Sequence, residues 1–289
     1  MQPQLSVAEH ATGVTWNCLE TFIDADPYWS RWIDPWITHA NSGVPGWVAR
    51  GHGTRTLIVS ADLIPQSITN DPNPITWEVP CDKGAFDGYA KQLARALIRA
   101  GEGYSVIRLG KEMNGGWEQD YMGTTKSEQH DWAQCFANEV TAMRSVLGAH
   151  FLFDWNPNTC TNNYPLADFY PGNKYVDIIG ADIYDADCMG PLPAPSPASW
   201  NKLYVEVLGL AAITRFAIHH HKPMSIPEWG LVSNPPGNGD DAFYVNGIGW
   251  YVAHHVVAFQ SYFDLASNGV LALGPDVPNA LRAYVHAFG

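Results

Sequence analysis

The chain has 289 residues, of which 46% are hydrophobic and 16% charged, a composition typical of a folded protein with a large core. Its formal net charge of −13 would repel phosphate backbones and anionic lipid surfaces, so we exclude nucleic acid and membranes as partners. The sequence has no apolar run of the roughly 20 residues that span a bilayer, and its N-terminus does not read as a signal peptide. We expect a soluble, monomeric protein whose location stays open; secretion is compatible with the removal of a signal peptide.

The first predicted elements have weak sequence signals, and the later ones have clearer signals. Residues 14–23 read as a first strand, and 28–40 have the apolar spacing of a helix. Residues 56–60 form a clear buried strand, and the four prolines in 65–84 predict a long loop. A helix follows over 86–100, closed by Gly101.

Two later strands each lead to a glutamate. The run Ser-Val-Ile-Arg-Leu at 105–109 is followed by Gly-Lys-Glu112, and period-two alternation places Arg108, Gly110 and Glu112 on one face. The run Pro-Met-Ser-Ile-Pro at 223–227 leads to Glu228, Trp229 and a glycine. The two glutamates are therefore a pair of carboxylates, each placed at the end of a different strand.

The other elements alternate between strand and helix. We predict helices over 127–147, 200–220, 241–254 and 279–287, and strands over 151–155, 175–184 and 256–262. Polar residues gather where strands end, which is where a (β/α)8 TIM barrel keeps its active site. The sequence therefore predicts one barrel domain over 1–289. Its first βα unit could be irregular. A doubly wound sheet is the alternative, but the chain has no glycine-rich phosphate fingerprint.

Paired glutamates at strand ends suit a retaining glycosidase, in which one carboxylic acid protonates the leaving oxygen and a second carboxylate attacks the anomeric carbon. We assign Glu112 as acid/base and Glu228 as nucleophile. Arg108 or the Tyr184 hydroxyl would keep the nucleophile ionised. The sequence has neither metal-ligand spacing nor a phosphate loop, so we expect no metal and no cofactor. Cys160 and Cys188 could meet as a loop disulfide.

Three motifs resemble glycoside hydrolase family 26, the β-mannanase family of a retaining (β/α)8 clan. They are Arg-Leu-Gly-Lys-Glu-Met-Asn-Gly-Gly-Trp ending at Trp117, the stretch 170–184 ending at Tyr184, and Lys-Pro-Met-Ser-Ile-Pro-Glu-Trp-Gly ending at 230. The resemblance implies endo-acting hydrolysis of a β-linked polysaccharide, most often β-1,4-mannan. It also implies that Tyr184 orients the nucleophile, and it supplies the remaining expected substrate contacts, which are Asn114, Trp117, Trp155 and Trp229.

One departure from the family keeps alternatives open. Better-known members carry histidine before the acid/base glutamate, where this chain has Lys111. If this ammonium faced the site, it would depress the pKa of the acid. The alternatives are cleavage of β-glucan or β-xylan, a carbohydrate-binding barrel without turnover, and an unrelated barrel enzyme that uses the glutamates for proton abstraction.

Overall fold

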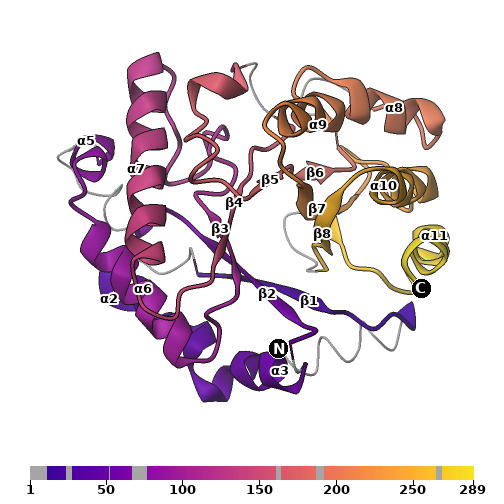
Figure 1. Cartoon of the computed structure of the whole chain (residues 1–289). Coiled ribbons are helices and arrows are strands. Elements are labelled where there is room, and N and C mark those ends of the chain that lie inside the picture. Colours follow the sequence, from indigo (N-terminus) through magenta and orange to yellow (C-terminus); the bar gives the residue numbers. More distant parts are fainter. Residues whose placement is uncertain are drawn as a thin grey trace. The chain divides into compact units, whose positions relative to one another are not determined.

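The computed structural model describes residues 12–23, 28–51, 53–66, 77–160, 164–186, 192–264 and 269–289. These residues fall into two compact units, each built of parallel strands and helices (Figure 1). The first unit holds the described residues of Asn17–Pro157 and Tyr164–Ile178, and the second holds 12–16, 158–160 and the described part of Ile179–Gly289. No helix within the described ranges is long and apolar enough to cross a membrane.

Four parallel strands form the sheet in the described part of the first unit. They pair in chain order: β1 (Cys18–Phe22), β2 (Thr56–Ala61), β3 (Val106–Leu109) and β4 (Leu152–Trp155). All of β3 and almost all of β2 is buried, as expected for a parallel sheet covered on both faces. Because the strands are parallel and in register, their carboxyl ends lie at one edge.

The helices of the first unit differ in part from expectation. The predicted helix over 28–40 is wrong: the chain forms α2 (Trp29–Trp32), η1 (Trp36–Thr38) and η2 (Ala40–Ser42), since Pro35 interrupts it. The helices α3 (Val44–Arg50), α5 (Glu78–Asp82) and η3 (Leu166–Asp168) were not predicted, whereas α6 (Asp87–Arg99) and α7 (Lys126–Arg144) were. A capping box between Thr125 and Glu128 starts α7, and α6 packs against α7 (Figure 1).

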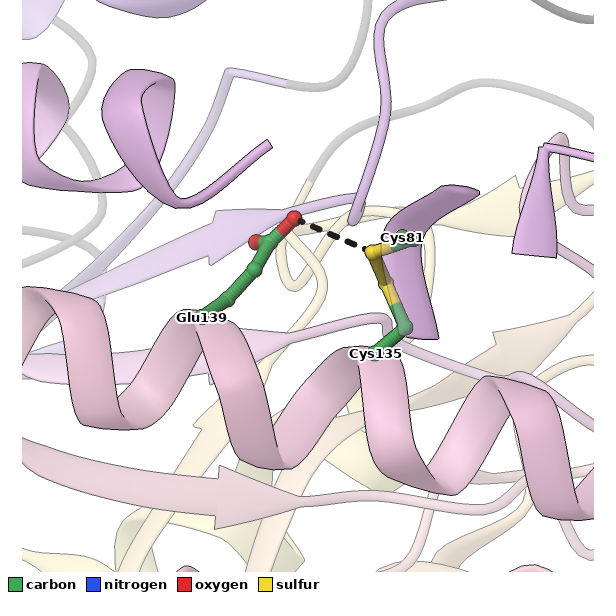
Figure 2. A group of neighbouring side chains, drawn as sticks. All are labelled: Cys81, Cys135 and Glu139. Carbon is green, nitrogen blue, oxygen red and sulfur yellow. Dashed lines mark hydrogen bonds between the residues drawn. A yellow bond between two sulfur atoms is a disulfide. The ribbon is translucent and has the colours of Figure 1, made fainter. Parts of the chain in front are cut away.

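A disulfide joins Cys81 of α5 to Cys135 of α7, 54 residues apart in sequence (Figure 2). Both half-cystines are buried, and Glu139, one turn further along α7, points toward them with Oε1 3.9 Å from Cys81 Sγ. Sequence reasoning missed this pair because nothing in its spacing distinguishes it. The predicted pairing of Cys160 with Cys188 falls outside the described residues, because Cys188 is not among them.

The second unit is organised around β7 (Met224–Val232), every residue of which is buried. It pairs in parallel with β5 (Ile178–Gly180), β6 (Ile183–Tyr184) and β8 (Val257–Tyr262), and antiparallel with β9 (Val270–Leu271). The predicted strand over 175–184 is thus two short strands.

The described residues of the second unit form four helices: α8 (Pro197–Val205), α9 (Leu210–His219), α10 (Ala242–His254) and α11 (Pro278–Phe288) (Figure 1). The single helix predicted over 200–220 is wrong. The chain turns between α8 and α9, where the Gly209 N–H donates to the Glu206 carbonyl at 2.8 Å.

Candidate active site

Glu112 lies on a tight turn that begins where β3 ends. The backbone leaves the extended conformation at Gly110 (φ 58°), and Glu112 itself has φ 48°. The predicted common face of Arg108, Gly110 and Glu112 is therefore wrong, since alternation stops at Leu109. Two hydrogen bonds support the unusual backbone: Glu112 N–H donates to the Asn156 carbonyl (2.9 Å), and Gly115 N–H donates to the Glu112 carbonyl (2.7 Å).

Glu112 is 8% exposed, and Trp117 contacts its side chain. The Trp117 indole Nε1–H donates to Glu112 Oε2 at 2.6 Å. Trp117 is 59% exposed, and its indole ring packs directly over Gly115, where a Cβ would lie 2.5 Å from two ring carbons. Trp117 thus joins a solvent-facing aromatic surface to the carboxyl group expected to act as the acid.

Arg108 of β3 is fully buried. Its Nη1 donates to Glu20 Oε1 (2.8 Å) and Ser60 Oγ (3.1 Å), and its Nε donates to Asn156 Oδ1. Since the Asn156 carbonyl accepts from the Glu112 N–H, Arg108 is linked through Asn156 to the turn that carries the expected acid. Asn114, another expected contact, is 2% exposed.

Lys111 forms two ion pairs that the sequence did not reveal. Its Nζ lies 3.1 Å from Asp62 Oδ1, at the end of β2, and 2.6 Å from Glu118 Oε2. The polar end of the strand at Asp62 was visible in the sequence, whereas nothing marked Glu118. Two carboxylates therefore compensate the extra positive charge beside Glu112.

Glu228 lies within β7 in the second unit and is 9% exposed. The Tyr184 hydroxyl, from the neighbouring β6, donates to Glu228 Oε2 at 2.8 Å. The Glu228 N–H donates to Asp182 Oδ1 at 2.9 Å, and the Asp182 carbonyl accepts from Thr159 Oγ1 at 2.8 Å. The structure thus brings Tyr184 to the glutamate it was expected to orient, and Asp182 fixes the backbone there.

Trp155 and Trp229, the other tryptophans expected to contact sugar, are fully buried. Trp155 packs against Phe169, with ring centroids 5.3 Å apart. Trp229 packs against Tyr262, and its indole N–H donates to Gln260 Oε1 at 2.6 Å. Both rings contribute to the core, so of the three expected aromatic walls Trp117 has the exposed ring.

Two groups in the first unit bring together side chains of kinds that ligate metals: Asp62, Glu118 and Asp120, and Cys81, Cys135 and Glu139. In the first group the Lys111 ammonium already serves as counter-ion. In the second the sulfurs are bonded to each other. We assign neither group to a metal.

The comparisons with known proteins bear on both the fold and the family. The model of glycosyl hydrolase family 26 matches residues 85–218, a range that includes Glu112 and Tyr184 but ends before Glu228. Among solved structures, the YdhT protein from Bacillus subtilis is 15% identical with a TM-score of 0.67, and the match covers 100% of this chain and 81% of that one.

Two further structures are similar over nearly the whole chain. A modular endo-β-1,4-mannanase from Cellulomonas fimi is 16% identical with a TM-score of 0.69, over 96% of this chain and 64% of that one. A β-mannanase from Bacteroides ovatus is 12% identical with a TM-score of 0.67, over 97% of this chain and 81% of that one. At these identities the likeness shows the fold, and the predicted (β/α)8 barrel is confirmed.

Proposed function

We propose that this chain cleaves β-1,4-linked mannan by a retaining mechanism with two glutamates. The match of residues 85–218 to the model of family 26 confirms its resemblance to these glycoside hydrolases. The observation that carries the proposal is that the matched range contains the Glu112 motif. The names of the Cellulomonas fimi and Bacteroides ovatus enzymes support mannan as the polymer. The proposal treats residues 1–289 as one monomeric catalytic domain.

In the proposed first step, Glu228 attacks the anomeric carbon as a carboxylate while Glu112 gives its proton to the departing glycosidic oxygen. The bond between the anomeric carbon and that oxygen breaks, and an ester forms to Glu228. In the second step Glu112 takes a proton from water, which attacks the same carbon and releases Glu228. The Tyr184 hydrogen bond at 2.8 Å supports the role of Glu228, because a donor stabilises an ionised carboxylate.

Substrate contact is proposed for the exposed ring of Trp117, which can lie against the apolar face of a sugar. Asn114 and Tyr184 are proposed as polar contacts to the same sugar chain. Trp155 and Trp229 are proposed to act indirectly, since both rings pack in the core. Arg108 is proposed to act through Asn156, to which its Nε donates.

The test compares the parent chain with Glu112→Ala and Glu228→Ala on β-mannan, mixed-linkage glucan and xylan, with release of reducing ends as the readout. On an aryl β-mannoside, azide should rescue Glu112→Ala to give a β-glycosyl azide and Glu228→Ala to give an α-glycosyl azide, which assigns the two roles separately. Glu102→Gln is the control, because it removes a buried carboxyl group that has no part in the proposed reaction.

Each outcome has one interpretation. Activity on glucan or xylan alone would replace mannan as the substrate. Binding of a polysaccharide without turnover by the folded parent chain would support the carbohydrate-binding alternative. Equal activity of the parent and Glu228→Ala would refute the two-glutamate mechanism.

A further inference from the structure

Tyr244 carries a buried hydroxyl group that has no direct part in the proposed reaction. It lies in the first turn of α10 and is fully buried. Its ring packs against the indoles of Trp200 and Trp229, with ring centroids 6.2 and 6.0 Å away. The Tyr244 hydroxyl donates to the Ile183 carbonyl of β6 at 2.6 Å. One side-chain hydrogen bond thus joins α10 to the strand that carries Tyr184.

The carbonyl that accepts this hydrogen bond belongs to the same peptide group as the Tyr184 nitrogen. The Ile183 C=O and the Tyr184 N–H lie in one plane, because a peptide bond does not rotate freely. A donor on the Ile183 oxygen therefore limits how the backbone can turn at Tyr184. The Tyr184 side chain starts from this backbone, and its hydroxyl donates to Glu228 Oε2 at 2.8 Å.

β6 is a short strand, so one added hydrogen bond matters. Its two residues pair with Trp229 and Gly230 of β7, and the Asp185 N–H that follows donates to the Gly230 carbonyl at 3.0 Å. Each strand residue adds about 3.3 Å, so β6 extends over only about 7 Å. The bond from Tyr244 fixes this strand from a second element, directly before the residue that contacts Glu228.

Tyr244 is itself well fixed as a donor. Asp241 caps α10, and its Oδ1 accepts from the Phe243 N–H at 2.7 Å and from the Tyr244 N–H at 3.1 Å. Burial, followed by the charge of Asp185, raises the pKa of Tyr244 well above its usual range. The hydroxyl therefore keeps its proton and remains able to donate to the Ile183 carbonyl.

We propose that Tyr244 is a positioning residue: its hydrogen bond to the Ile183 carbonyl keeps the Tyr184 hydroxyl in place on Glu228. The inference rests on the nucleophile role proposed for Glu228. Tyr244 is fully buried, so it contacts neither the sugar nor the reacting atoms in this account and acts through Tyr184.

The test removes the hydroxyl and keeps the ring. In Tyr244→Phe, kcat/KM on the polysaccharide that the parent cleaves should fall by about three- to tenfold, the effect of losing one neutral hydrogen bond. Tyr251→Phe is the matched control, since Tyr251 lies on the same helix, is fully buried and shares a hydrogen bond with Thr214 Oγ1 of α9 at 2.7 Å. It loses a bond of the same kind, and its kcat/KM should equal that of the parent.

A double-mutant cycle separates positioning from a general structural effect. Tyr184→Phe removes the hydroxyl that contacts Glu228, so a residue that acts through Tyr184 then has nothing left to position. In that background Tyr244→Phe should cost little further kcat/KM, whereas in the parent it costs about three- to tenfold. Equal losses in the two backgrounds would show that Tyr244 acts independently and would overturn the inference.

A second readout does not depend on turnover. In protein labelled with 3-fluorotyrosine, the ¹⁹F NMR signal of residue 184 is identified by its loss in Tyr184→Phe. This signal should shift in Tyr244→Phe and stay in place in Tyr251→Phe. If the parent cleaves no polysaccharide, the proposed function fails, but the ¹⁹F signal still tests the positioning. An unmoved signal and an unchanged kcat/KM in Tyr244→Phe would overturn the inference and leave the proposed function intact.

If Tyr244→Phe does not fold, Tyr244 can be loosened through its backbone instead. Asp241→Ala removes the acceptor of the Tyr244 N–H, so it should lower kcat/KM and shift the ¹⁹F signal of residue 184. Asp241→Asn keeps an acceptor oxygen and should restore both to the parent values. A folded Asp241→Ala variant with the kcat/KM and the ¹⁹F signal of the parent would contradict the proposal.

Discussion

Gly115 offers a sharp test of the contact between Trp117 and Glu112. A Cβ at position 115 would lie 2.5 Å from two carbons of the Trp117 ring and 3.0 Å from a third. Ordinary carbon contacts lie at about 3.5–4.0 Å, so Gly115→Ala must displace the ring by about 1 Å or more. The indole N–H then cannot keep its 2.6 Å hydrogen bond to Glu112.

The size of the effect follows from that lost bond. Glu112 becomes charged as it gives up its proton in the proposed first step, and a hydrogen bond to a charged group contributes about 1.5–3 kcal/mol. This corresponds to about a tenfold to 150-fold change in rate. We expect Gly115→Ala to lower kcat/KM on the polysaccharide by at least about tenfold. The melting temperature should change little, because Trp117 is an exposed residue whose ring can swing outward.

Gly116→Ala is the matched control. An added Cβ there would meet nothing within 4 Å, and the change in backbone freedom is the same. The assay is kcat/KM from release of reducing ends, combined with a thermal melt of each variant. If the two alanine variants have equal kcat/KM, the contact between Trp117 and Glu112 has no part in catalysis.

Three further outcomes are expected for stability, each from equilibrium unfolding in denaturant. Arg108→Met should cost about 3–5 kcal/mol because it leaves the Glu20 carboxylate buried without its counter-charge, and adding Glu20→Gln should recover part of that loss; strictly additive costs would contradict this account. Replacing Cys81 and Cys135 by alanine should cost about 4 kcal/mol, the chain-entropy value for closing a loop of 54 residues, and a cost below about 1 kcal/mol would refute the expectation. Burial raises the pKa of Glu102 to about 8 from 4.5, so the stability that its protonated form contributes is lost as the pH rises through this window. Glu102→Gln should therefore flatten the decline by about 1.4 kcal/mol per pH unit between pH 5 and 8, and an unchanged slope would count against it.

The sequence predicted the strands well because their signal is local. Continuous apolar runs ending in polar residues marked β2, β3, β4 and β7, and their order indicated the barrel. Helix boundaries were less reliable. The pattern over 28–40 continued across Pro35, and the single helix over 200–220 proved to be two because the chain turns at Gly209.

The parts of the site that were missed depend on tertiary contacts. Trp117 is exposed and Trp155 is buried because different side chains pack around each ring. The sequence does not show which side chains these are. The partners of Lys111 come from β2 and from a segment seven residues further on, so its charge looked uncompensated in the sequence. The turn at Glu112 was hidden as well, because alternation along a strand gives no sign of where extended backbone ends.

Because Glu112 has a positive φ, stability and catalysis favour different residues at this position. A side-chain-bearing residue in the left-handed region costs about 1–2 kcal/mol, which glycine avoids and asparagine reduces. Screens of variant libraries for thermal tolerance alone would therefore enrich glycine or asparagine at position 112 and discard the acid. A programme to make this chain more heat-resistant needs an activity screen in every round, because here the most stable backbone and the working enzyme require different residues.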